Sequence, residues 1–368
     1  MNKCLFFIVL ITCSYAFCQN KNIYFGVKQN FAELLIHKNE VSHLANYRIK
    51  GISAILETHT NGEKAWHPYY NYPNYGLILN YQDMGSPALG EVYSLSGFYK
   101  FFFFKRRVYL TTGLGLGFTN KRFDANKNPK NIAYGSSILA NILFELNYRL
   151  TPDFNKRLHF DFGLFFQHFS NAKIKSPNSG TNHYGLQFGV SYNLNDSFVK
   201  NNRLDQKPNI TVKPDVNRPL QFHFIVASGL NDLEILNTKP YPFFTFTALT
   251  EKTLSFVSSV QLGSDLFLSY AAKEYNQFMA SAYPEEAVDR NADWKRIGIF
   301  AGHKFHLGYL KLVSQLGYYL YYPTEYLDRI YTRIGIQYVM GKHIYASILL
   351  KSHYAKAEGL ELGIGFKL

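Results

Sequence analysis

A histidine and a serine stand two residues apart at the end of an alternating segment of this chain. His168 and Ser170 close the stretch LHFDFGLFFQHFSN, which spans 158–171. A serine hydroxyl is a poor nucleophile until a neighbouring imidazole takes its proton, so this pair could supply the nucleophile and the base of an ester hydrolase. In an extended strand, side chains two residues apart point to the same face, which would bring the two groups together.

The face that His168 and Ser170 share is the apolar one. Its other members are the even-numbered residues Leu158, Phe160, Phe162, Leu164 and Phe166. In a soluble protein such a face would be core, whereas in a transmembrane β-barrel it faces lipid. The barrel interpretation places the pair against acyl chains and predicts a lipid-cleaving enzyme. Outside that context, a His and a Ser at a strand end are more often interfacial polar residues without a catalytic role.

Residues 1–18 have the features of a secretory signal peptide. Lys3 is followed by the apolar run LFFIVLI and then by small and polar residues, with Gln19 as the expected mature start. The residues before Cys18 do not form a lipoprotein signal. All three cysteines lie within this segment, so we expect the mature chain to lack disulfides, a thiol nucleophile and cysteine metal sites.

The composition is typical of an aromatic-rich β protein. Phe, Trp and Tyr make up 17% of the 368 residues, which suits aromatic girdles at membrane interfaces, and no later segment resembles a membrane-spanning helix. The net charge of +13 fits either solvated basic loops or attraction to lipopolysaccharide phosphates, and an exported barrel is not expected to bind nucleic acid. The histidines show no shared metal-ligand spacing, so we expect neither a metal nor another cofactor.

The chain divides into two halves of similar organisation, joined by a polar linker at 196–219. Strand-like runs in the first half lie at about 21–30, 46–59, 75–84, 91–104, 107–120, 132–150, 158–171 and 182–194. Those in the second half lie at about 220–232, 241–250, 253–270, 293–307, 309–322, 328–340, 342–354 and 359–368. The predicted fold class is therefore an all-β, antiparallel transmembrane β-barrel, either as tandem eight-stranded barrels over 19–195 and 220–368 or as one sixteen-stranded barrel.

The ends of the two halves favour the tandem arrangement. The first half closes with HFSNAK and, after a longer loop, GLQFGVSYNL, while the second closes with HYAKAEGLELGIGFKL. An internal copy of a closing strand is not expected inside a single large pore. Ala355 stands where the first copy has Ser170, and Lys356 where it has Asn171. The second half is therefore predicted to be a degenerate repeat without an active site.

The residues HFSNAKIKSPNSGTN, at 168–182, resemble the His-x-Ser-Asn-Ala…Pro-Asn-x-Gly block of the PagL-type lipid A 3-O-deacylases. Members of that family are eight-stranded outer-membrane barrels that hydrolyse an acyl ester of lipid A, and the resemblance covers about residues 19–195. It implies that Ser170 is the nucleophile, that His168 is the general base and that Asn171 contributes to the oxyanion hole.

The third catalytic residue of the family is a Glu, and Asn182 takes the matching position here. In the serine-protease template, replacing the orienting Asp by Asn costs about 10⁴ in rate, although papain-like enzymes do use an Asn as orienter. The even position of Asn182 lies on the outward face of its strand, on the same side as His168. Asp161 and Glu145 have inward parity and should not reach an outward His, whereas Asp124 has outward parity but lies two strands away.

Three basic residues are candidates for contact with lipid A phosphates: Lys173 and Lys175 in the following loop and Arg122 two strands away. If the mature N-terminus is periplasmic, the seventh strand runs outward and carries the site to the outer leaflet. The sequence thus predicts an outer-membrane serine esterase acting on lipid A or lipopolysaccharide, with self-association left open. The alternatives are a non-catalytic lipopolysaccharide-binding or structural barrel, and a porin. Which acyl position is cut is not decided by the sequence.

Overall fold

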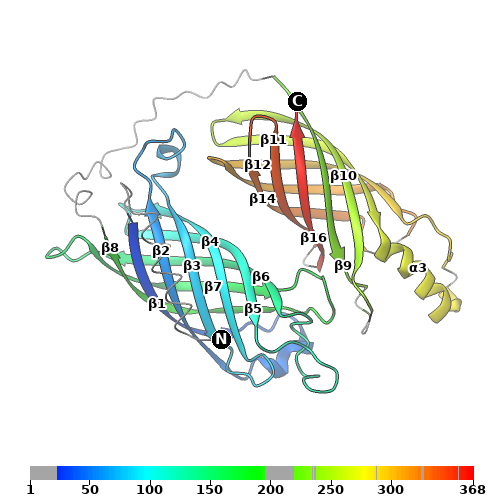
Figure 1. The fold of residues 1–368 in the computed structure, drawn as a ribbon, viewed down its shortest axis with the longest axis horizontal. Coiled ribbons are helices and arrows are strands. Elements are labelled where there is room, and N and C mark those ends of the chain that lie inside the picture. Colours follow the sequence, from blue (N-terminus) through cyan, green and yellow to red (C-terminus); the bar gives the residue numbers. More distant parts are fainter. Residues whose placement is uncertain are drawn as a thin grey trace. The chain divides into compact units, whose positions relative to one another are not determined.

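The computed structural model of the chain describes residues 23–194, 219–233, 235, 238–286, 288–324, 327–354 and 356–368. Within these ranges the strands close into two antiparallel barrels, β1 to β8 and β9 to β16, each drawn in Figure 1 as a ring of arrows. The predicted signal peptide, nearly all of the predicted linker and Ala355 lie outside the described residues.

The first barrel is an up-and-down ring in which each strand pairs with the next and β8 pairs with β1. Its strands are β1 (Ile23–Leu34), β2 (Arg48–His59), β3 (Asn74–Asp83), β4 (Glu91–Phe103), β5 (Val108–Thr119), β6 (Ile138–Leu150), β7 (Leu158–Ser170) and β8 (Thr181–Asn193). Two short 3-10 helices lie in its loops, η1 (Asn39–Leu44) and η2 (Pro68–Tyr70).

The second barrel has the same topology, and β16 closes it on β9. Its strands are β9 (Gln221–Asn231), β10 (Tyr241–Ser255), β11 (Ser258–Ser269), β12 (Lys295–Leu307), β13 (Leu310–Tyr321), β14 (Ile330–Val339), β15 (Ile344–His353) and β16 (Lys356–Lys367). The helix α3 (Tyr270–Ala282) and the 3-10 helix η3 (Pro284–Glu286) follow β11.

The closure of β8 on β1 and of β16 on β9 confirms the tandem arrangement, and the alternative of one sixteen-stranded barrel is wrong. Period-two alternation is the same in both architectures, so the strand pattern alone could not separate them. The sequence analysis predicted no element between β11 and β12, where the structure has α3. No helix among the described residues is long and apolar enough to cross a membrane.

The interior of the first barrel is filled with paired charges and amides. Lys28 Nζ bonds Glu145 Oε2 at 2.5 Å, Arg149 Nε bonds Asp161 Oδ1 at 2.8 Å, and Lys100 pairs with Glu57. Buried charges of opposite sign at such distances satisfy one another and leave no wide aqueous channel. Asp161 and Glu145 therefore point inward, as their positions in the sequence predict.

The outward face of the same barrel is apolar. On β7 and β8 it exposes Leu164 (58% exposed) and Leu186 (53%), which the register pairs directly across the two strands. Alternation of buried polar and exposed apolar residues is the reverse of a soluble barrel and fits a lipid-facing wall. This face also carries the histidine and serine of the sequence motif.

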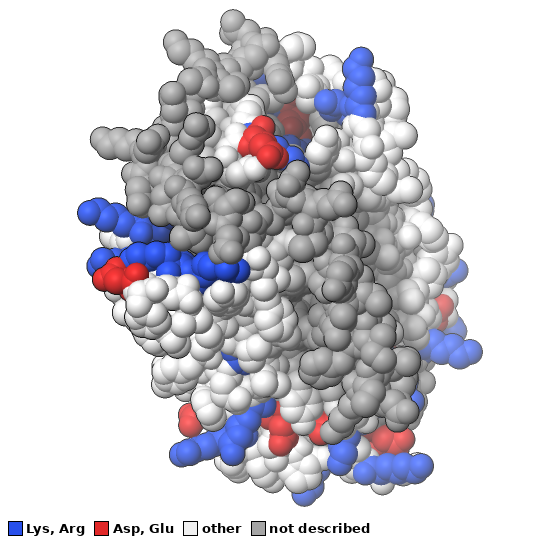
Figure 2. All heavy atoms as spheres, turned by 60° about the vertical axis from the view of Figure 1, so that its left-hand side comes forward, with Lys and Arg blue, Asp and Glu red and all other residues white. Residues whose placement is uncertain are grey.

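The chain separates into two compact units, and loops 123–136 and 170–179 group with the second barrel. On the face shown in Figure 2, Lys and Arg side chains stand in several separate groups and do not form one continuous basic patch. The high net charge is thus dispersed on that face, as expected of solvated loops.

Candidate active site

His168 and Ser170 lie on the outward face of β7, as the alternation predicts. The residues between and before them, Phe169 and Gln167, are buried on the inward face, whereas His168 and Ser170 are partly exposed. Residues two apart on a strand have Cα atoms about 6.6 Å apart and side chains on one side. The strand therefore holds the two groups as neighbours on the wall of the barrel.

Asn182 on β8 is the cross-strand partner of His168 in the register of the barrel. His168 Nδ1 and Asn182 Oδ1 are 2.6 Å apart. An amide oxygen only accepts hydrogen bonds, so the imidazole Nδ1–H donates and the other ring nitrogen, Nε2, is the acceptor in this tautomer. That is the tautomer a general base requires if Nε2 is to take a proton from a hydroxyl.

Ser170 is the last residue of β7, and the chain leaves the barrel wall directly after it. Two successive residues, Ala172 (φ 52°) and Lys173 (φ 64°), adopt the left-handed region. Non-glycine residues in this region cost about 1–3 kcal/mol each, so surrounding contacts must fix the conformation. The alternating sequence gave no sign of this strained turn after the serine.

Asn171 ties the loop that follows β7 into a closed shape. Its backbone N–H donates to Asn178 Oδ1 at 2.8 Å, and its side-chain Nδ2 donates to the Lys175 carbonyl at 2.6 Å. The Asn171 side chain is buried, so its amide supports the loop from within. The oxyanion role of Asn171 stays a prediction, and Asn178 is a supporting residue that sequence analysis missed.

We call residues 171–180 the site loop. A neighbouring loop, 123–136, packs against it, since the Ser179 N–H donates to the Ile132 carbonyl at 3.2 Å. A Cβ at Gly135 would collide with the Lys175 and Pro177 carbonyls, so the close approach of the two loops requires glycine there. The composition of these loops offered no signal for this contact, because it depends on two segments far apart in sequence.

The three predicted phosphate contacts have different surroundings. Lys175 and Arg122 are exposed, whereas Lys173 is buried with 3% of its surface exposed. An exposed cation can meet an anionic group without losing its hydration, and a buried one cannot. Lys175 and Arg122 are thus accessible to an anionic group, and phosphate contact stays a prediction for all three residues.

The carboxylates considered as substitutes for the family's Glu are engaged elsewhere. Asp161 and Glu145 form ion pairs inside the barrel. Asp124 accepts the backbone N–H groups of Asn126 and Lys127 within its own loop. Among the described residues, no group of three or more His, Cys, Asp or Glu side chains could hold a metal ion.

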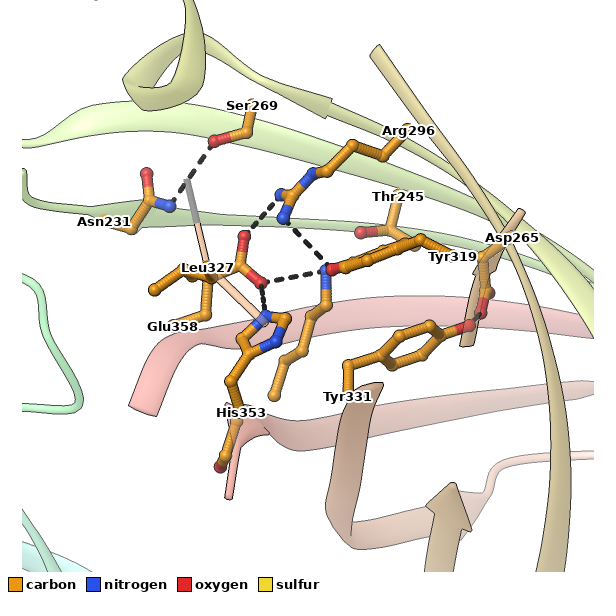
Figure 3. Close-up of polar contacts among 12 residues, drawn as sticks. Asn231, Thr245, Asp265, Ser269, Arg296, Tyr319, Leu327, Tyr331, His353 and Glu358 are labelled. Atoms are coloured by element: carbon orange, nitrogen blue, oxygen red, sulfur yellow. Dashed lines mark hydrogen bonds and ion pairs between the residues drawn. The ribbon is translucent and has the colours of Figure 1, made fainter. Parts of the chain in front are cut away.

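The second barrel places the aligned histidine differently. His353 on β15 points inward, where its Nε2 lies 2.9 Å from Glu358 Oε2. Figure 3 shows Glu358 between His353 and Arg296, and the Lys351 Nζ is 3.0 Å from Glu358 Oε2. The similar peptides HYAKAE and HFSNAK thus present their histidines to opposite faces of their barrels. The predicted loss of the serine at Ala355 falls outside the described residues.

Comparison with known families separates the two barrels as the fold does. Residues 51–191 match the family described as lipid A 3-O-deacylase (PagL), and residues 220–368 match the acyloxyacyl hydrolase C-terminal domain. Lipid A 3-O-deacylases are ester hydrolases of the outer membrane with a β-barrel fold. The second barrel thus matches a different family model from the first. Its origin as a degenerate repeat stays a prediction.

No curated protein matches the chain. Among solved structures, engineered variants of the porin from Rhodopseudomonas blastica are similar at 9% identity, covering 95% of this chain and all of the porin, with TM-scores of 0.21 and 0.19. Similarity at this level carries no information on function. The two family matches, together with the barrels they cover, show that the chain is an ester hydrolase that belongs to the lipid A 3-O-deacylase (PagL) family and carries that family's C-terminal domain.

Proposed function

We propose that the first barrel hydrolyses an acyl ester of lipid A on its outward face, with Ser170 as nucleophile, His168 as general base and Asn182 as orienter. The observation that carries the proposal is the 2.6 Å contact between His168 Nδ1 and Asn182 Oδ1, on the same face as Ser170. It gives the imidazole the tautomer and orientation of a base without a carboxylate.

The reaction follows from these three groups. Ser170 Oγ attacks the ester carbonyl carbon while its proton passes to His168 Nε2, and the carbonyl oxygen becomes an oxyanion. Collapse of the tetrahedral intermediate breaks the bond to the sugar oxygen, which receives the proton from His168. Water then attacks the acyl-serine with the same base, releasing the fatty acid and restoring Ser170. Asn171, or the backbone N–H groups beside it, would stabilise the oxyanion.

Substrate would reach this site sideways from the membrane. Exposed apolar side chains on β7 and β8, such as Leu164 and Leu186, offer a surface for acyl chains below the serine. Lys175 and Arg122, both exposed, would meet the phosphates of the lipid A headgroup. The proposed setting is the outer membrane after removal of residues 1–18, with the site loop on the outer side.

The test is mass spectrometry of lipid A from cells that produce the protein or its Ser170→Ala variant at equal outer-membrane level. Ser228→Ala is the matched control, because Ser228 is an outward serine on β9 of the second barrel. Loss of one hydroxyacyl mass with the wild type and the control, but not with Ser170→Ala, supports the proposal. Unchanged lipid A with folded wild type contradicts it and favours a lipopolysaccharide-binding role.

A further inference from the structure

The site loop holds a strained backbone directly beside the proposed nucleophile. Ala172 and Lys173 both have positive φ, and the Ile174 N–H donates to the Asn171 carbonyl at 3.1 Å across this turn. The backbone N–H groups that follow a catalytic serine commonly help to form its oxyanion hole. The first of them, that of Asn171, donates to Asn178 Oδ1 at 2.8 Å, so this turn would contribute through the N–H groups after Asn171. Whatever fixes this turn therefore fixes the direction of those donors relative to Ser170.

Asp232, the first residue after β9, binds the site loop at the end of that turn and again three residues further on. Its backbone N–H donates to the Lys173 carbonyl at 3.0 Å. Its Oδ2 accepts the Ser176 N–H at 3.2 Å, and its Oδ1 accepts the Ser176 hydroxyl at 3.0 Å. The two residues of the loop that it binds belong to the same compact unit as Asp232.

The contacts of Asp232 can hold the site loop rigidly. The Asp232 side chain is 1% exposed, and a buried carboxylate is stable where several donors surround it. Thr238 Oγ1 lies 3.4 Å from Asp232 Oδ1 and donates to the Ile235 carbonyl at 2.7 Å, so it stands beside the carboxylate in the same loop. Hydrogen bonds from N–H and O–H groups to a fixed carboxylate are directional. They therefore constrain the orientation of the loop backbone as well as its distance from Asp232.

We propose that Asp232 is a positioning residue for the esterase site, holding the strained turn after Ser170 in the form that stabilises the oxyanion. The inference rests on the function proposed above and gives the C-terminal domain a part in it. Asp232 does not touch the reacting atoms, and it acts through Lys173 and Ser176. Its loss should lower kcat more than it raises KM, because the acyl-binding wall of β7 and β8 is not altered and only the loop contact of Lys175 would shift.

The experiment uses the full-length protein in detergent micelles and measures initial rates of fatty acid release from purified lipid A. Asp232→Ala should lower kcat about 10- to 100-fold, the effect of a misplaced catalytic donor, while KM rises by no more than the two- to fivefold expected from loss of the Lys175 contact. Asp232→Asn should be milder, since its amide oxygen still accepts one of the two Ser176 bonds. The control Asp328→Ala, at an exposed aspartate in the loop after β13, should match the wild type.

A double variant tests whether Asp232 acts through Ser176. Ser176→Ala removes the hydroxyl bond alone and should lower kcat less than Asp232→Ala. The combination Asp232→Ala with Ser176→Ala should be no slower than Asp232→Ala, because both substitutions remove the same contact. If Asp232→Ala does not fold, Asp232→Asn and Ser176→Ala replace it, and each should lower kcat by a smaller factor.

The outcomes separate this inference from the proposed function. If wild type hydrolyses lipid A in a Ser170-dependent way and folded Asp232 variants keep its kcat, the positioning role is wrong and the esterase stands. If the variants raise KM at constant kcat, Asp232 supports only the loop's contact with substrate and the inference is also wrong. If wild type shows no Ser170-dependent release, both proposals fall.

Discussion

The two barrels of this chain share a topology but use corresponding histidines in opposite ways. His168 faces outward and bonds Asn182 across the strand pair, whereas His353 faces inward and bonds Glu358. On a strand, a shift of one position moves a side chain from one face to the other. Similar peptides at the ends of two strands can therefore carry a surface site in one barrel and a buried ion network in the other.

The interiors of both barrels hold buried ion pairs, and the outward faces of both are apolar. In the first, Lys28 with Glu145 and Arg149 with Asp161 fill the lumen, and in the second, Arg333 Nε lies 2.9 Å from Glu361 Oε2. These ion pairs satisfy the charged groups of the lumen, but they have no access to lipid. Chemistry on lipid substrates requires polar groups on the outward wall. Both barrels have a serine and a histidine there: Ser170 and His168 in the first, and in the second Ser258, whose Oγ lies 2.7 Å from His303 Nε2.

The strongest test of this difference compares the two histidines. His168→Ala should lower lipid A hydrolysis by about 10²- to 10⁴-fold, because it removes the proposed general base. His353→Ala should leave kcat unchanged, because His353 has no access to the outward face. Fatty acid release by purified, folded variants measures both, and equal losses from the two substitutions would contradict the distinction between the barrels.

Substitutions in the ion network of the second barrel should lower the stability of that barrel and leave hydrolysis unchanged. Glu358→Gln leaves the Arg296 and Lys351 charges without their buried counter-ion and should destabilise this barrel by about 3–5 kcal/mol. The chain has two tryptophans, so the fluorescence of Trp294 in a Trp66→Phe background follows unfolding of the second barrel. An unchanged transition would show that the network adds nothing to stability.

The orienting role of Asn182 separates the outward histidine from an ordinary interfacial one. Asn182→Ala should lower kcat by about 10²-fold, because the imidazole loses the acceptor that sets its tautomer and direction. Asn182→Glu restores the carboxylate of the family and should retain or raise the rate. A rate in Asn182→Ala equal to wild type would mean that His168 needs no partner.

The smallest effect is expected at the exposed loop cations. Lys175→Ala and Arg122→Ala should each raise KM for lipid A by about two- to fivefold, the size of an exposed ion pair. The effect should fade at high salt, because screening weakens exposed charges. Lys342→Ala, at an exposed lysine of the second barrel, is the matched control. A salt-independent change in KM would indicate a structural role for the loop and not phosphate contact.

Strand alternation and turn residues predicted the sixteen strands closely, because each strand carries its own inward and outward pattern. The position of Asn182 opposite His168 also followed from parity, since a barrel fixes register between neighbours. The helix α3 was missed, as it lies between strands in a segment without period-two pattern. Contacts of Asn178, Gly135 and Asp232 were missed because loop folding joins residues that no local pattern relates.

The amide partner of His168 has a consequence for acidity. A carboxylate partner would change its charge as it takes up a proton, and the imidazole and its partner would then titrate together. The Asn182 amide does not titrate near neutral pH, so its Oδ1 is a neutral hydrogen-bond acceptor for His168 Nδ1–H at every working pH. The acid side of a pH–rate profile should therefore fall with the slope of a single ionisation, that of the imidazole alone.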